Sequence, residues 1–145
     1  VARDLKCDIL HLSGSGAAGG FGGGSVAFFN STLRMGIDIV LDITQFDRLA
    51  ADADLVLTGE GKLDGQSLRG KVVIGVARRA RQLGVPVAAL VGASETDVNA
   101  VYDEGVSGVF PINPMPQPFE TVREHAEKNL RFTVSNLMRY TERLR

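Results

Sequence analysis

The sequence predicts an α/β protein with a mostly parallel sheet and helices on both faces of that sheet. Short apolar segments alternate with longer segments in which apolar residues recur at helical spacing. Near-continuous apolar strands are typical of parallel sheets, because these sheets are buried on both faces. Two glycine-rich segments follow predicted strands, and ligands of such sheets bind beyond the carboxyl ends of the strands. We therefore expect both glycine-rich segments at one edge of the sheet.

The first 58 residues are predicted to contain three strands and two short helices. In chain order these are strand 6–13, helix 25–34, strand 37–42, helix 47–51 and strand 55–58. The segment 37–42 (IDIVLD) is assigned to a strand because it is rich in β-branched residues. A polar loop with four glycines is expected at 59–70.

The second half of the chain contains the clearest helix, over residues 71–83. Four apolar residues recur there at helical spacing: Val72, Val76, Ala80 and Leu83. Gly84 and Pro86 are expected to end this helix. The remaining patterns predict strand 87–91, helix 96–104, strand 108–112 and helix 119–144. The last helix is expected to turn one stripe inward: Val122, Ala126, Leu130, Leu137 and Leu144.

The composition suits one compact domain or a piece of a larger one. The 145 residues include 16 basic and 17 acidic side chains, so there is no basic surplus for nucleic-acid binding. The single cysteine, Cys7, cannot form an internal disulfide, and no Cys/His group has zinc-ligand spacing. No apolar run approaches the ~20 residues of a membrane span, and with no signal peptide we expect a cytoplasmic protein. The chain begins at Val1 without methionine, which suggests a fragment with part of an active site.

The first glycine-rich segment contains a G-x-G-x-x-G pattern from Gly14 to Gly19. Glycines let backbone N–H groups approach a phosphate, and a following helix adds the positive end of its dipole. One alternative function is therefore a dinucleotide-binding oxidoreductase, with Asp38 or Asp42 near the position of the ribose-binding carboxylate. Further glycines within 20–24 weaken the following helix and count against that function. The other alternative is close helix packing through small residues.

The second glycine-rich segment, residues 58–71 (TGEGKLDGQSLRGK), combines carboxylates, hydroxyls, an amide and cations. Its end fits G-x-x-x-x-G-K, but Val72 stands where a P-loop has Ser or Thr, so a standard P-loop is disfavoured. Carboxylates can hold Mg²⁺ or accept a hydroxyl proton, and lysine neutralises phosphoryl charge. Lys71 would begin a helix, where a cation opposes the helix dipole, and a bound anion would explain that placement. A solvated, capped loop is the alternative.

Taken together, these motifs resemble the bacterial glycerate kinase family, of the glycerate 2-kinase type. The resemblance runs from about residue 12 to the end of the chain and is most specific in the T-G-E-G-x-x-D-x-Q segment. It is carried by GAAGG at 16–20, GID at 36–38, ADLVLTGEG at 53–61, GVA at 75–77, PV at 86–87, ALVG at 89–92 and FPI at 110–112. Departures are small: Ser67 replaces a usual threonine, Val73 a common proline, and Ser13 a proline before the glycine cluster.

The resemblance implies ATP-dependent phosphorylation of D-glycerate with Mg²⁺, at the 2-hydroxyl, to give 2-phosphoglycerate. It also implies a two-domain α/β protein with a flavodoxin-like larger domain and a smaller inserted domain. Residues 1–145 would be the C-terminal part of the larger domain. The family's N-terminal A-P-D-S-F-K motif, which brings a catalytic acid and lysine, is absent here, so we expect the fragment alone to lack full activity.

Our site hypothesis assigns roles to residues of both segments. Glu60 and Asp64 position Mg²⁺ or accept the glycerate hydroxyl proton, and Lys71 neutralises phosphoryl charge. The residues expected to contact substrate or phosphates are Gly14, Ser15, Gly16, Gly19, Gly20, Thr58, Gly59, Gln66 and Ser67. The expected partners are D-glycerate and the missing N-terminal portion of the same enzyme. A sensor that binds a sugar acid or a nucleotide without turnover is a further alternative.

Overall fold

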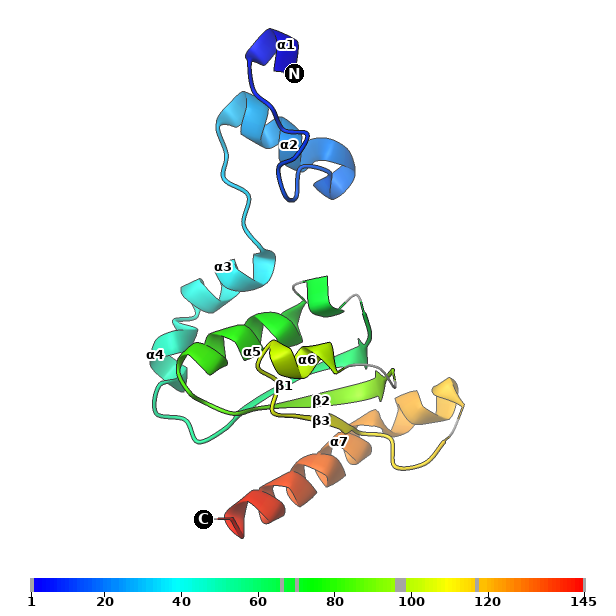
Figure 1. The fold of residues 1–145 in the computed structure, drawn as a ribbon. Helices are drawn as coiled ribbons and strands as arrows, with labels where there is room; N and C mark the ends of the chain where they lie inside the picture. The colour runs from blue at the N-terminus through cyan, green and yellow to red at the C-terminus, as the bar shows by residue number, and fades with distance from the viewer. Residues whose placement is uncertain (1, 66, 70, 96–98, 117, 145) are drawn as a thin grey trace. The chain divides into compact units, whose positions relative to one another are not determined.

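The chain folds into two compact units in the computed structural model, Val1–Gly36 and Ile37–Arg145. The structure describes residues 2–65, 67–69, 71–95, 99–116 and 118–144. Figure 1 shows the succession of elements along the chain. None of the described helices is long and apolar enough to cross a membrane.

The first unit contains α1 (Ala2–Leu5) and α2 (Ala17–Phe29). The strand predicted at 6–13 is wrong: the segment has no regular structure and ends in turns. Its polar residues interrupt the apolar run, and no described strand lies in this unit to pair with it. The helix predicted at 25–34 is the second part of α2, and it ends where Asn30 takes a left-handed conformation with φ of 52°.

The second unit is built on a three-stranded parallel sheet in the order β1-β2-β3. The strands are β1 (Val56–Leu63), β2 (Val87–Ser94) and β3 (Gly108–Pro111). The register pairs Thr58 with Ala89 and Leu90 with Phe110. Three of the five predicted strands are therefore confirmed, and the two N-terminal ones are not.

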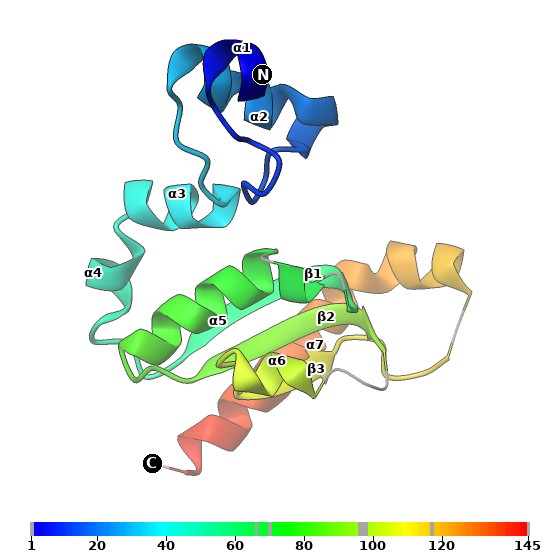
Figure 2. The same ribbon diagram turned by 45° about the horizontal axis from the view of Figure 1, so that its top comes forward.

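Helices cover both faces of this sheet, as the sequence predicts. Figures 1 and 2 show α5 (Val72–Gln82) and α6 (Ala100–Asp103) on one face and α7 (Phe119–Glu142) on the other. A short 3-10 helix, η1 (Ser67–Arg69), precedes α5. The predicted helix start at residue 96 lies outside the described residues, as do 97 and 98.

The segment 37–42, predicted as a strand, is helical and forms most of α3 (Gly36–Ile43). Its apolar residues also fit helical spacing, with Ile37 and Leu41 four residues apart, and Leu41 is buried. The close contact of Ile37 with α5 at Gly75 holds this helix against the core. The short helix predicted at 47–51 is confirmed as α4 (Phe46–Ala50).

The core lies between the sheet and α5. Val87, Ala89 and Val91 of β2 are fully buried against Ile74 and Ala77 of α5. The apolar spacing that predicts α5 thus reflects its packing on the sheet, and Gly84 with φ of 74° follows its last turn as expected. The inward stripe expected in α7 is only partly buried. Leu137 is buried, whereas Leu144 lies beyond the end of the helix and is exposed.

Candidate active site at the carboxyl end of β1

The polar segment predicted as a loop from residue 59 begins as a strand. Strand β1 continues to Leu63, which pairs with Ser94 of β2. Sequence reasoning placed the strand end too early because Gly59 and Gly61 have low strand propensity. The consequence is that Thr58, Gly59 and Glu60 sit on a rigid strand rather than in a loop.

Gly59 has a steric reason to be glycine. A Cβ atom at this position would collide with the backbone carbonyl oxygen of Leu90 on β2. A Cβ at Gly92 would similarly lie 2.5 Å from the carbonyl oxygen of Gly61. The two strands therefore approach each other closely where the T-G-E-G motif lies, and this fixes the direction of its flanking side chains.

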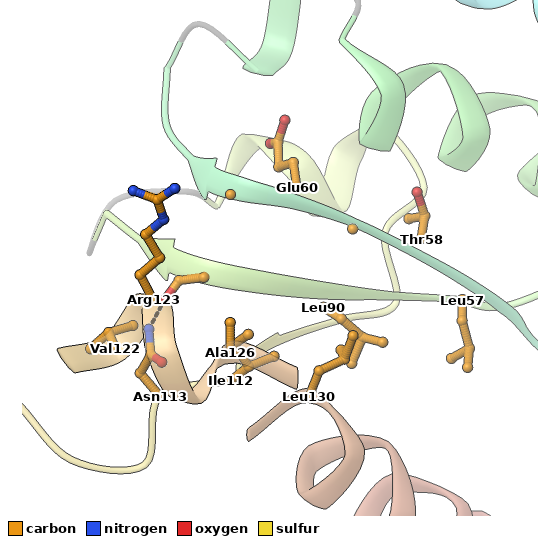
Figure 3. Close-up of a pocket in the computed structure, with 13 residues that line it drawn as sticks. Leu57, Thr58, Glu60, Leu90, Ile112, Asn113, Val122, Arg123, Ala126 and Leu130 are labelled. Carbon is orange, nitrogen blue, oxygen red and sulfur yellow. Dashed lines mark hydrogen bonds between the residues drawn. The ribbon is translucent and has the colours of Figure 1, made fainter. Parts of the chain in front are cut away.

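Glu60 and Thr58 project from the same face of β1, and Leu57 projects from the other (Figure 3). This alternation is that of an extended strand. The Oε1 atom of Glu60 is buried without a hydrogen-bond partner among the described residues. A buried carboxylate oxygen that lacks a protein partner is costly, and a bound ligand, ion or water would satisfy it.

Asp64 lies between two lysines just beyond the end of β1. Its Oδ1 atom is 3.8 Å from Nζ of Lys71, and its Oδ2 atom is 3.8 Å from Nζ of Lys62. Lys62 also donates a 2.9 Å hydrogen bond to Oε1 of Glu95, directly after β2, and this contact raises the pKa of Lys62. Ion pairs among these two lysines and two carboxylates thus connect the carboxyl ends of β1 and β2.

Ser67 holds the turn between β1 and α5. Its Oγ accepts a hydrogen bond from the Asp64 N–H at 3.2 Å, and its own N–H donates to the Asp64 carbonyl oxygen at 2.9 Å. The side chain is fully buried. The structure therefore gives Ser67 a role in positioning Asp64, whereas its contact with substrate stays a prediction.

Lys71 is the N-cap residue of α5, in extended conformation, and its side chain is about half exposed. No acidic residue lies in the first turn of α5, so the positive end of the helix is not neutralised there. The predicted placement of a cation at this helix start is confirmed. Gln66, also predicted for the site, lies outside the described residues.

A magnesium ion was expected at Glu60 and Asp64. No group of three or more metal-ligating side chains occurs in the part of the chain that the structure describes. Mg²⁺ is commonly held by one or two carboxylates together with substrate phosphates and waters, so a three-residue cluster is not required. The unsatisfied oxygen of Glu60 and the carboxylate of Asp64 are each of the ligand type that Mg²⁺ prefers.

The first glycine cluster belongs to the other unit, and it follows no strand. The expectation that it follows a strand and forms a strand-to-helix turn is therefore wrong. Gly22 and Gly23 allow close packing. A Cβ at Gly22 would lie 2.5 Å from the Gly14 carbonyl oxygen, and a Cβ at Gly23 would lie 2.8 Å from Cδ1 of Ile9. Small-residue packing, one of the two alternatives, thus explains part of the cluster.

The other glycines of the cluster have free space around them. A Cβ at Gly16, Gly19 or Gly20 would meet nothing within 4 Å. Gly19 and Gly20 have φ of 69° and 94°, and with Ala18 they interrupt α2 by non-helical backbone. Ligand contact by this stretch, with Gly14 and Ser15 before it, stays a prediction.

The acids proposed for ribose binding do not support the dinucleotide alternative. Asp38 and Asp42 lie in helix α3, not at the end of a strand. Asp42 contacts the Arg79 guanidinium of α5, which also lies 3.2 Å from Asp47. A dinucleotide-binding fold needs a strand, a glycine turn and a helix, followed by an acid at the end of the next strand. The described residues do not form this arrangement.

A model of the glycerate kinase family matches residues 1–142. The chain belongs to the glycerate kinase family. Glycerate kinase from Bacillus cereus is 41% identical over 133 residues, which cover 92% of this chain and 35% of that protein. Glycerate 2-kinase from Escherichia coli K12 is 38% identical over 112 residues, covering 77% of this chain and 29% of that protein.

The structural comparison agrees with the family assignment. A crystal structure assigned as glycerate kinase 2 from Salmonella typhimurium LT2 aligns with a TM-score of 0.71 and 40% identity. The alignment covers 97% of this chain and 36% of the other. The chain thus spans about a third of the length of the curated glycerate kinases that it matches.

Sequence reasoning missed two charged residues of this candidate site, Lys62 and Glu95. They are 33 residues apart, so no local spacing connects them, and only the pairing of β1 with β2 brings them together. The position of Glu95 directly after a predicted strand was an available signal, because strand ends of a parallel sheet meet at one edge. Of the predicted residues that the structure describes, Asp64, Ser67 and Lys71 lie at this edge, whereas Thr58, Gly59 and Glu60 lie within β1.

Proposed function

We propose that this chain supplies part of the active site of an ATP-dependent kinase that phosphorylates D-glycerate to 2-phosphoglycerate. Family membership supports the reaction class. The single observation that carries the site is the group at the end of β1, where Asp64 lies between Lys62 and Lys71. We further propose that residues 1–145 are the C-terminal part of the larger domain.

In the proposed reaction the 2-hydroxyl oxygen of glycerate bonds to the γ-phosphorus of ATP as the bond from that phosphorus to the ADP oxygen breaks. The hydroxyl proton passes to a carboxylate, for which Asp64 and Glu60 are the candidates. Phosphoryl transfer depends mainly on positioning and on charge stabilisation. Lys71 and Lys62 supply positive charge near Asp64, and Lys71 stands where α5 adds the positive end of its dipole.

Mg²⁺ would neutralise phosphate charge when bound, and Glu60 with Asp64 are the residues that would hold it. Ser67 and the close approach of β1 and β2 at Gly59 keep these side chains in place. We propose that Thr58 and Gln66 orient donor and acceptor, and that the backbone of Gly14–Gly20 contacts phosphates or the substrate carboxylate. These roles rest on the residue types and on the family.

The remaining parts of the proposal concern the whole protein. The catalytic constellation is proposed to be completed by the N-terminal portion of the family's chain, since this chain spans about a third of its relatives. A cytoplasmic location stays a prediction from the sequence. The isolated 145 residues are expected to lack full turnover.

The test is an assay of the full-length protein that carries this chain, with Mg-ATP and D-glycerate. ADP release that depends on D-glycerate is expected, and ³¹P NMR of the product should show 2-phosphoglycerate. Omission of Mg²⁺ should abolish turnover. Tight glycerate binding without ADP release would contradict the kinase proposal and favour a sensor, whereas 3-phosphoglycerate would contradict only the assigned hydroxyl.

A further inference from the structure

A groove of about 530 Å³ lies between the sheet and α7, on the face opposite α5. Its walls are formed by apolar side chains of the strands and of the helix: Leu57, Leu90, Ile112, Val122, Ala126 and Leu130. Figure 3 shows these side chains pointing toward one another, while Glu60 and Thr58 point to the other face of β1. Thr58 and Glu60 also border the groove, but their side chains are directed to the opposite face of β1.

The groove is an apolar surface that the described residues of the second unit leave partly uncovered. Leu57 on β1 and Leu130 on α7 are each 41% exposed. Between them the floor contains glycines at 59, 61 and 92, which add no side-chain bulk. A parallel sheet is normally buried on both faces; among the described helices of the second unit, α7 lies on this face while α5 and α6 cover the other.

The winding of the chain indicates which kind of element is missing. The connections from β1 to β2 and from β2 to β3 run in one direction across the sheet, and both place their helices on the same face. Such crossovers are right-handed, so the face on which the helix lies depends on the direction in which the chain moves across the sheet. A connection from β1 to a strand on its other side, away from β2, would run in the opposite direction and would place its helix on the opposite face. That face carries the groove.

The relatives contain enough additional chain to supply this element. The matched region is only 35% of the Bacillus cereus and Bacillus subtilis glycerate kinases. We propose that the groove binds an amphipathic helix from the part of the family's chain that lies outside these 145 residues. Its apolar side would pack between Leu57 and Leu130, and a carboxylate would face Arg123 at the end of the groove (Figure 3).

The direct test is site-specific photo-cross-linking in the full-length protein that carries this chain. Benzoylphenylalanine replaces Ala126 or Leu130 in the groove. The control variant carries it at Leu49 on α4, a side chain that is 66% exposed. Mass spectrometry should identify one cross-linked segment outside residues 1–145, with apolar residues at helical spacing, from both groove sites and not from the control. Cross-links to a second copy of the chain, or no intramolecular cross-link, would overturn the proposal.

A second measurement uses substitutions in two contexts, the full-length protein and the 145-residue chain alone. Leu130→Asp is expected to lower the thermal midpoint of the full-length protein by about 5 °C or more, and that of the short chain by much less. Leu49→Asp should have little effect in either context. Equal effects of Leu130→Asp in both contexts would show that nothing else covers the groove. Neither measurement depends on turnover, so a failed kinase assay leaves this test intact.

Discussion

The Nζ atom of Lys71, at the start of α5, lies 3.8 Å from Oδ1 of Asp64, just beyond β1. The side chain of Asp64 is only 20% exposed and has Lys62 on its other side. The two ammonium groups attract this carboxylate from two sides and so restrict its direction. This arrangement suits a group that accepts a proton or holds a metal ion, and it makes Asp64 the sharpest target in the proposed site.

Asp64→Asn in the full-length protein is expected to reduce kcat at least ~100-fold, because a charge that acts in the transition state is lost. The thermal midpoint should change little, since partly exposed ion pairs contribute only ~0–1 kcal/mol. Steady-state kinetics and calorimetry measure the two effects. As control, Glu127→Gln removes an exposed pair with Arg131 on α7 and should leave kcat unchanged. Wild-type turnover in Asp64→Asn would remove Asp64 from the site.

The two glycines of the T-G-E-G motif that lie on β1 are predicted to respond differently to alanine. Gly59→Ala should lower the free energy of unfolding by about 2–3 kcal/mol, because its methyl group meets the backbone oxygen of Leu90, which cannot rotate away. Gly61→Ala should change it by less than about 0.5 kcal/mol, because nothing lies within 4 Å of its Cβ. Urea unfolding of the 145-residue chain compares them. Equal losses would mean that β1 and β2 are not so close at Gly59.

The sequence predicted well those elements whose local pattern and tertiary packing agree. Helix α5 has an apolar stripe, a glycine after its end and a buried face, so each signal gave the same answer. Strand β2 is nearly all apolar and buried. The segment 37–42 failed because β-branched composition favoured a strand, whereas the actual helix α3 depends on a contact between Ile37 and Gly75, far apart in sequence.

The sequence predicted where the candidate site lies but not how its residues are arranged. The density of polar groups in residues 58–71 marked the carboxyl end of β1, and the structure brings Asp64 and Lys71 together at that end. The sequence did not indicate that β1 continues through Gly59 and Gly61, because glycine has a low strand propensity. Pairing with β2 stabilises the strand there. The pairing of Lys62 with Glu95 likewise depends on strand register.

The contact between α3 and α5 can be tested at Gly75. Gly75→Ala should lower the free energy of unfolding by about 1–3 kcal/mol, because its Cβ would lie 2.5 Å from Cγ1 and 2.7 Å from Cγ2 of Ile37. A β-branched side chain has few rotamers with which to move away. Ile37→Ala in the same chain should relieve the clash, so the double-mutant cycle gives a coupling energy of more than ~0.5 kcal/mol. Additive effects in urea unfolding would show that the two helices do not touch there.

The contact between α5 and the residue after α6 gives a prediction on pH. Arg78 donates a 2.5 Å hydrogen bond to Oε2 of Glu104, and this contact lowers the pKa of Glu104 in the folded chain. A carboxyl group with a lowered folded pKa stabilises the fold above its unfolded pKa of about 4.3. That stabilisation is lost as the pH falls through the lower folded pKa.

Glu104→Gln should therefore reduce the free energy of unfolding by about 0.5–1 kcal/mol at pH 7, a modest effect because both side chains are partly exposed. The difference from wild type should shrink toward zero as the pH falls to about 3, where Glu104 is protonated in the unfolded chain and increasingly in the folded one. Urea unfolding at a series of pH values measures this, with Glu127→Gln as an exposed control. A difference that stays constant with pH would show that Glu104 stabilises the chain by packing rather than by its charge.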